Sequence, residues 1–263
     1  MPEQQGAPAL PLDGPALPLD DLSGVKRVLV VTAHPDDVDF GAAGSVASWT
    51  RAGVEVAYCV ATDGDAGGSD RSVSRADMAR LRRQEQREAA AEVGVSEVTY
   101  LGFPDGRLGP WLDLDLRREI SRVVRRFRPD RLVSQSPERN WDRVGASHPD
   151  HLAAGEAAIC VAYPDARNPF AHPELLVEGL EPHAVGELWM MASPRPNKAV
   201  DITAAFPAKT RALRRHVSQV GHEVDIEERI RSWGAMNAAA AGLPEGSLAE
   251  LFQVVVMPAS GSA

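Results

Sequence analysis

Apolar runs of strand length alternate with segments of helix length along most of this 263-residue chain. The first run, 28–33, is largely β-branched and lacks polar alternation, which is typical of a strand buried on both faces of a parallel sheet. Further strands are expected at 54–62, 98–101, 131–134, 188–191 and 252–257, and helices at 41–52, 75–93, 114–127, 151–163, 207–219 and 224–240. This alternation predicts an α/β, Rossmann-like fold with a mostly parallel sheet and helices on both faces.

The length and composition favour a single folded domain after a short arm. Apolar residues make up 44% of the chain, enough for a sizeable core, and residues 24–263 are expected to form one domain. Residues 1–23 are rich in Pro, Leu and Asp and contain Pro-Ala-Leu-Pro-Leu-Asp twice. This composition predicts a flexible arm, or a strap laid on a neighbouring subunit.

Charge and cysteine usage limit the classes of partner and the compartment. A net charge of −9 argues against nucleic acid and membrane surfaces as partners. Cys59 and Cys160 both lie in apolar stretches, so buried free thiols in a reducing compartment are expected. With no visible signal peptide and no apolar run of about 20 residues, a cytoplasmic protein is expected.

Two short blocks concentrate histidines and carboxylates. Residues 34–37 read His-Pro-Asp-Asp directly after the first strand, and residues 147–151 read Ser-His-Pro-Asp-His. Ionisable groups are costly to bury unless they are paired or bound to a metal. Either block alone also fits a polar turn or a capped helix start with surface histidines. Together, and with the first block at the edge of the sheet where α/β folds bind ligands, they predict two halves of one divalent metal site.

Three residues of these blocks have the types expected for the ligands of a catalytic zinc. Such a site takes three protein ligands and leaves one position open, and His34, Asp37 and His151 meet that count. One zinc ion per chain is therefore expected, although iron, cobalt or manganese would accept the same ligand types.

The remaining residues of the two blocks have the types needed for hydrolysis. Asp36 stands beside the ligands without being one, which makes it the candidate general base. His148, oriented by Asp150, is the candidate donor to the oxyanion of a tetrahedral intermediate. The sequence thus predicts metal-dependent hydrolysis.

These motifs resemble those of the PIG-L/LmbE-like family of zinc-dependent N-acetylglucosamine deacetylases. The resemblance runs from about residue 27 to at least residue 219 and includes the two blocks, Thr-Asp-Gly at 62–64, Arg-x-x-Glu at 82–85 and Leu-Gly-Phe-Pro-Asp-Gly at 101–106. It implies the same three ligands, Asp36 as the base that takes a proton from water and passes it to the departing amine, and Asp150 holding the ring of His148. It also implies an amino-sugar small molecule as substrate, with acetate and a free amine as products.

The resemblance further implies contacts to the sugar. Asp65, Arg82 and Asp105 match positions that face the sugar in relatives. Two of them have a simpler alternative: Arg82 would pair with Glu85 on a helix surface, and Asp105 would be a turn residue.

The later part of the chain is similar to the bacillithiol and diacetylchitobiose deacetylase branch, whose members tend to form trimers or hexamers. A homo-oligomer is therefore expected, with His216 completing a neighbour's pocket or, alternatively, lying on a helix surface. Arg167 is a candidate substrate contact on the same grounds. Ala146 stands where several mycothiol-pathway relatives have Tyr, which weakens an assignment to that pathway.

Two other functions remain open. The first is an amidase of the same fold that cleaves a larger acyl group, such as a mycothiol S-conjugate or an acyl-glycopeptide antibiotic intermediate. The second is a catalytically silent metal- or sugar-binding protein, against which Asp36 argues because a binder needs no base beside its metal.

Overall fold

The computed structural model describes residues 16–68 and 70–257, which contain a seven-stranded sheet in the order β3-β2-β1-β4-β5-β7-β6. The strands are β1 (Arg27–Thr32), β2 (Glu55–Thr62), β3 (Glu97–Phe103), β4 (Arg131–Gln135), β5 (Glu187–Met191), β6 (Lys198–Asp201) and β7 (Ala249–Val256). From β3 to β5 all neighbours are parallel, whereas β7 runs antiparallel to both β5 and β6. The predicted mostly parallel α/β sheet is confirmed.

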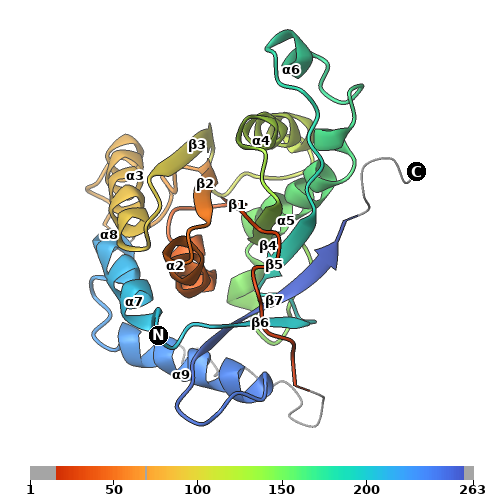
Figure 1. Ribbon diagram of the computed structural model, residues 1–263. Helices are drawn as coiled ribbons and strands as arrows, with labels where there is room; N and C mark the ends of the chain where they lie inside the picture. The colour runs from red at the N-terminus through yellow and green to blue at the C-terminus, as the bar shows by residue number, and fades with distance from the viewer. Residues whose placement is uncertain (1–15, 69, 258–263) are drawn as a thin grey trace.

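Helices cover both faces of the sheet (Figure 1). They are α1 (Asp37–Gly41), α2 (Ala43–Arg51), α3 (Arg75–Glu92), α4 (Asp113–Phe127), α5 (Pro149–Ala162), α6 (Glu174–Val177), α7 (Phe206–Arg215), α8 (Val217–Val220) and α9 (Ile226–Ala240), with short 3-10 turns η1 (Val144–Ser147) and η2 (Asp165–Arg167). None of the helices in the described ranges is long and apolar enough to cross a membrane.

The continuous apolar run of β1 is explained by burial on both faces. Successive strand side chains point to opposite sides of a sheet. Val28 and Val30 accordingly join the core beneath α2, α7 and α9, while Leu29 and Val31 join the core beneath α4 and α5. Because all four side chains are fully buried, a polar residue at any of these positions would be left without water on either side.

The strand order places a binding crevice between β1 and β4. From β1 the chain first proceeds to β2 and β3 on one side and then crosses to β4 and β5 on the other. In open α/β sheets the connections diverge at such a switch point, and ligands bind there beyond the carboxyl ends of the strands. The first His-Pro-Asp block follows β1 directly, so it lies at this crevice.

The structure describes only residues 16–23 of the expected flexible arm, and these residues contact the folded domain. Residues 1–15 lie outside the described residues. Leu19 forms a parallel bridge with Ala199 of β6, and the Asp20 carboxylate pairs with Arg131 at 2.8 Å. Residues 18–20 therefore pack on their own sheet rather than extending as a free strap, because a buried guanidinium on β4 requires their carboxylate.

Other features also differ from the sequence prediction. β6 was not predicted, because four residues beside a Pro-containing turn carry too short an apolar pattern. The expected helix 207–219 is broken at His216 into α7 and α8. Of the two free thiols, Cys59 is buried as expected, whereas Cys160 is only half-buried.

Candidate active site

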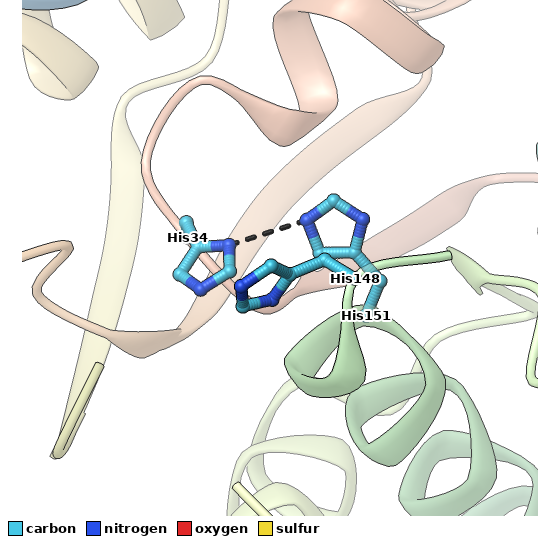
Figure 2. A group of neighbouring side chains, drawn as sticks. All are labelled: His34, His148 and His151. Atoms are coloured by element: carbon cyan, nitrogen blue, oxygen red, sulfur yellow. Dashed lines mark hydrogen bonds between the residues drawn. The ribbon is translucent and has the colours of Figure 1, made fainter. Parts of the chain in front are cut away.

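The two His-Pro-Asp blocks meet at the crevice because α5 packs closely on β4. Gly155 of α5 permits this contact, since a Cβ at that position would lie within 3.0 Å of the main-chain carbonyl oxygen of Gln135. The N-terminus of α5, which carries His148 and His151, is thereby held beside the loop that follows β1. Segments more than a hundred residues apart in sequence form one cluster (Figure 2).

The three predicted metal ligands lie at the mutual distances that a metal requires. Nδ1 of His34 is 3.2 Å from Nε2 of His151 and 3.5 Å from Oδ2 of Asp37, while Oδ1 of Asp37 is 3.0 Å from Nε2 of His151. Tetrahedral ligands bound at about 2.0–2.1 Å from zinc lie about 3.3 Å from each other. The donor set and its spacing therefore fit a divalent metal ion.

Asp37 is fixed from two directions. Its Oδ2 accepts hydrogen bonds from the backbone N–H of His34 at 2.7 Å and from Nε2 of Gln135 at 2.7 Å. Burial acts to raise the pKa of Asp37, but the neighbouring His151 and His34 outweigh burial and hold that pKa well below its usual range. The carboxylate is thus ionised, as a metal ligand must be.

In His34 and His151, the ring nitrogen that points away from the cluster also has a hydrogen-bond partner. Nε2 of His34 lies 3.2 Å from Asp150 and 3.2 Å from Asp105, and Nδ1 of His151 lies 3.2 Å from the carbonyl oxygen of Ala146. Outer partners of this kind set the tautomer and orientation of metal-binding histidines. When a metal is bound, the nitrogens that face each other across the cluster can therefore direct their lone pairs at it.

The carboxylate of Asp150 does not occupy the place expected for it. It contacts His34 and accepts hydrogen bonds from the backbone N–H groups of Gly106 at 2.7 Å and Leu108 at 3.1 Å. His148 instead interacts with the main chain of Asp150, whose N–H donates to Nδ1 at 3.2 Å. The structure therefore corrects the expectation that the Asp150 side chain holds the His148 ring, because that carboxylate is already filled by other donors.

His148 forms the N-cap of α5 and points an N–H toward the cluster. Since Nδ1 accepts the backbone hydrogen bond, the proton of the neutral ring is on Nε2. The ring centroid is 5.1 Å from that of His34 and 5.4 Å from that of His151 (Figure 2). Burial and the two neighbouring imidazoles lower the pKa of His148. A neutral N–H donor thus adjoins the ligands.

Asp36 lies beside the ligands in a strained backbone conformation, with φ 88° and ψ −26°. Burial raises its pKa to about 6, against the opposing charge of Arg82. Arg82 is itself buried and donates to Oδ2 of Asp36 at 3.1 Å, to the carbonyl of Pro35 at 2.6 Å and to the carbonyl of Gly64 at 3.0 Å. Neither a surface pair with Glu85 nor an open sugar contact describes Arg82, because its guanidinium is used to hold Asp36 and its loop.

An open groove of about 460 Å³ is lined by residues 65–68, 70, 71 and 73 together with Arg75 and Met78 of α3. Its wall includes Asp65, whose side chain is 24% exposed and pairs with Arg75. Asp105 joins the groove to the cluster, since one carboxylate oxygen accepts from the N–H of Ala66 at 2.9 Å and the other lies 3.2 Å from His34. The groove has the size of a small-molecule site, and Asp65 is the predicted sugar contact that faces it.

Comparison with known proteins identifies the family. The sequence model described as GlcNAc-PI de-N-acetylase (PIG-L) matches residues 29–162, which span both His-Pro-Asp blocks. The chain belongs to the PIG-L family. It is accordingly a deacetylase, an enzyme that hydrolyses an amide bond, and the family together with the cluster of His and Asp side chains fits a divalent metal.

Two similar proteins and one similar solved structure are also named as deacetylases. Diacetylchitobiose deacetylase of Thermococcus kodakarensis is 33% identical over 78% of this chain and 74% of its own length. Probable N-acetyl-alpha-D-glucosaminyl L-malate deacetylase 2 of Bacillus cereus is 29% identical over 74% of this chain and 84% of its own. The structure of N,N′-diacetylchitobiose deacetylase from Pyrococcus horikoshii, in complex with its inhibitor MPG, superimposes with a TM-score of 0.81 and 28% identity over 89% of this chain and 85% of that one.

Arg167 is not brought to the site. It lies on η2, just after the C-terminal end of α5, with its guanidinium over the ring of Tyr163 and bonded to the carbonyl of Val185. The 14-residue helix α5 is about 20 Å long, and His151 is in its first turn. Arg167 is therefore at the far end of α5 from the cluster.

His216 is not at the surface. It is fully buried, and its Nε2 lies 2.8 Å from Oδ2 of Asp39. Because His216 is enclosed by residues of its own protomer, it lies neither on a helix surface nor in a neighbour's pocket, the two positions expected from the sequence.

Sequence reasoning also missed side chains that organise the site. Gln135 ends β4 and holds Asp37, and Gln86 of α3 accepts from the backbone N–H of Asp36 at 2.8 Å. The available signals were weak: an amide at the end of a buried strand, and an amide one residue after the Arg-x-x-Glu motif. An uncharged side chain of this kind gives no indication of its partner until the fold is known.

Proposed function

We propose that this PIG-L enzyme removes the N-acetyl group from an N-acetylglucosamine-containing small molecule, using one zinc ion per chain held by His34, Asp37 and His151. The observation that carries the proposal is the cluster itself, in which one ring nitrogen each of His34 and His151 and the two carboxylate oxygens of Asp37 make contacts of 3.0–3.5 Å. Relatives named as deacetylases of diacetylchitobiose and of N-acetylglucosaminyl malate support the amino-sugar substrate.

The residues around the cluster divide the hydrolysis between them. His34, Asp37 and His151 would hold the zinc ion, which would supply Lewis-acid polarisation of the amide carbonyl and a lowered pKa, toward about 7, for water. Asp36, whose pKa of about 6 keeps it ionised at neutral pH, takes a proton from the attacking water and later delivers it to the departing amine. The products are acetate and a free amine, so Asp36 ends the cycle as it began.

His148 and the groove provide the remaining functions. The neutral Nε2–H of His148 donates to the oxyanion of the tetrahedral intermediate, which stabilises charge that develops only in the transition state. The groove beside Asp65 would accept the sugar, because a carboxylate at its wall offers hydrogen-bond acceptors for hydroxyl groups. Asp105 would act indirectly on the sugar by positioning the groove wall. Its backbone N–H donates to the Asp65 carboxylate, and its own carboxylate accepts from the N–H of Ala66.

A substrate series tests the identity of the acyl group. Turnover of N-acetylglucosamine, N,N′-diacetylchitobiose and N-decanoylglucosamine would be compared at equal concentrations with zinc-loaded enzyme. We expect kcat/KM to be highest for an N-acetyl sugar. A preference for the decanoyl compound would overturn the acetyl assignment in favour of the amidase that cleaves larger acyl groups.

An Asp36→Ala variant tests whether the site performs chemistry at all. Removing a general base typically lowers the rate by about 10²–10⁴-fold while leaving the metal ligands intact. We expect that loss with zinc content unchanged. Full activity in Asp36→Ala would overturn the mechanism, and a wild-type protein that binds zinc and cleaves no acylated amino sugar would favour the silent binding protein. Asp142→Asn, on an exposed loop of the same region, is the control for removing a carboxylate.

The assembly and the compartment stay predictions. A trimer or hexamer is expected from the resemblance to one branch of the family, and light scattering on eluting protein would measure the mass of the assembly. Cytoplasmic location would be measured by cell fractionation.

A further inference from the structure

A buried chain of hydrogen bonds runs from Asp36 to a histidine 180 residues further along the sequence. The backbone N–H of Asp36 donates to Oε1 of Gln86 at 2.8 Å, Nε2 of Gln86 donates to Oδ2 of Asp39 at 2.8 Å, and Nε2 of His216 donates to the same Oδ2 at 2.8 Å. Gln86, Asp39 and His216 are all 0% exposed. None of the three is a metal ligand or lines the groove, so the metal site does not account for them.

The direction of every bond in this chain is fixed. A backbone N–H only donates, so Gln86 must present its oxygen to Asp36 and its NH₂ group to Asp39. The carboxylate oxygen of Asp39 only accepts, so His216 must donate from Nε2. Among the described residues Oδ1 of Asp39 has no hydrogen-bond partner, so Gln86 and His216 both donate to Oδ2. Removing the His216 donor would leave the buried Asp39 carboxylate with the Gln86 amide as its remaining side-chain donor, so the positions of Asp39 and Gln86 would be less firmly held.

The chain ends at the most strained residue of the site. Asp36 has φ 88°, a conformation that is uncommon for residues other than glycine and persists only when its surroundings enforce it. Arg82 holds the carbonyl of Pro35 and the carboxylate of Asp36, while Gln86, one helical turn further along α3, holds the N–H of Asp36. Since His34 and Asp37 flank this peptide, its orientation decides where the Asp36 carboxylate lies relative to the metal.

The local fold keeps His216 in place independently of the site. His216 sits at the break between α7 and α8, and its carbonyl accepts the N–H groups of Gln219 and Val220 at 2.9 Å each. Glu85 of α3 fastens α8 through the N–H and hydroxyl of Ser218, at 2.7 Å and 2.6 Å. The break in the helix therefore serves to turn the imidazole inward against α3.

We propose that His216 is a positioning residue that acts through Asp39 and Gln86 to hold Asp36 in its left-handed conformation, and so to aim the general base. The proposal rests on the proposed role of Asp36 as that base. His216 touches neither substrate nor metal, and its effect is confined to the step that Asp36 carries out.

Two substitutions at the same position separate positioning from packing. His216→Gln keeps an N–H donor near the position of Nε2, whereas His216→Leu fills the space without one. A displacement of about 1 Å at a catalytic group costs up to about 10²-fold in rate. We expect His216→Leu to lower kcat by about 10- to 100-fold with KM and zinc affinity within about twofold of wild type, and His216→Gln to recover most of that loss. Val217→Ala, which shortens an exposed side chain on α8 without touching the chain of bonds, should leave kcat unchanged.

A double variant gives the decisive result. If His216 acts through Asp36, then adding His216→Leu to Asp36→Ala will not lower the residual rate further, because the group being positioned is already gone. A further loss of the same factor, or wild-type kcat in His216→Leu alone, would overturn the proposal. Should His216→Leu not fold, Gln86→Met removes the acceptor from the N–H of Asp36 and is subject to the same criteria. An inactive wild-type enzyme would instead refute the proposed function.

Discussion

The carboxylate of Asp150 lies 3.2 Å from Nε2 of His34, across 116 residues of sequence. The contact joins the second His-Pro-Asp block to the first without a metal between them. Because two backbone N–H groups also bind this carboxylate, its position is set by the fold and not by the histidine alone. Asp150 thus orients His34, the proposed metal ligand, rather than His148, the proposed oxyanion donor.

Asp150→Asn should weaken zinc binding without removing a ligand. Loss of an outer partner of a metal-binding histidine typically costs about 10- to 100-fold in metal affinity or activity. We expect zinc affinity, measured by competition with a chromophoric chelator, to fall within that range. The exposed Asp142→Asn should bind zinc as wild type does, and unchanged affinity in Asp150→Asn would contradict the role given to that carboxylate.

Gly155→Ala should disturb the metal site from one turn away. The added methyl group would lie within 3.0 Å of the Gln135 carbonyl, so α5 must move off β4 and carry His151 away from Asp37. Overpacking of this kind typically costs about 1–3 kcal/mol. We expect a lower free energy of unfolding and weaker zinc binding, measured by urea titration and chelator competition.

Gly145→Ala is the matched control for that change, because a methyl group there would meet nothing within 4 Å. It should leave stability and zinc affinity unchanged. If Gly155→Ala matched Gly145→Ala in both measurements, the close packing of α5 on β4 would not be what assembles the site.

Zinc binding should release a proton from His34. Burial lowers the pKa of His34, but the carboxylates of Asp105, Asp150 and Asp37 outweigh burial and raise it to about 12. The metal-free side chain is therefore protonated at pH 7, whereas a ligand must be neutral. Calorimetry of zinc binding in two buffers of different ionisation enthalpy should show about one proton released per zinc, and a binding heat independent of the buffer would contradict this.

Asp20→Ala should destabilise the fold through its ion pair with Arg131. The guanidinium lies 3.8 Å and 5.0 Å from the ring centroids of Trp189 and Trp49, and both charged side chains are nearly fully buried. Breaking a buried pair typically costs 3–5 kcal/mol, and we expect about 3 kcal/mol here because Arg131 keeps Glu187. Urea unfolding would measure the loss. Asp21→Ala, exposed and adjacent, should change stability by less than about 0.5 kcal/mol.

The parts of this fold that could be predicted from sequence are those that carry a local pattern. The apolar run 28–33 predicted a doubly buried central strand, and the His-Pro-Asp blocks predicted which side chains would meet, because parallel strands bring their carboxyl ends to one edge. Local patterns also gave the α/β class. These inferences need only the chain's own periodicity and residue types.

The parts that could not be predicted depend on which side chain finds which partner across the fold. The direction of the Asp150 carboxylate, the burial of Arg82 against Asp36 and the pairing of His216 with Asp39 are set by tertiary packing. β6 was missed because its four residues carry no clear strand pattern. It forms a strand because it pairs with β7 across the fold. Sequence therefore indicated which side chains gather at the site and not the side chains that hold them.

The most direct test of the proposed function is acetate release from N,N′-diacetylchitobiose by enzyme stripped with a chelator and then reloaded with zinc. We predict that release stops on stripping and returns with about one zinc per chain, and that His151→Ala neither retains the metal nor recovers activity. Release that persists in the stripped enzyme would contradict a metal-dependent hydrolysis at His34, Asp37 and His151.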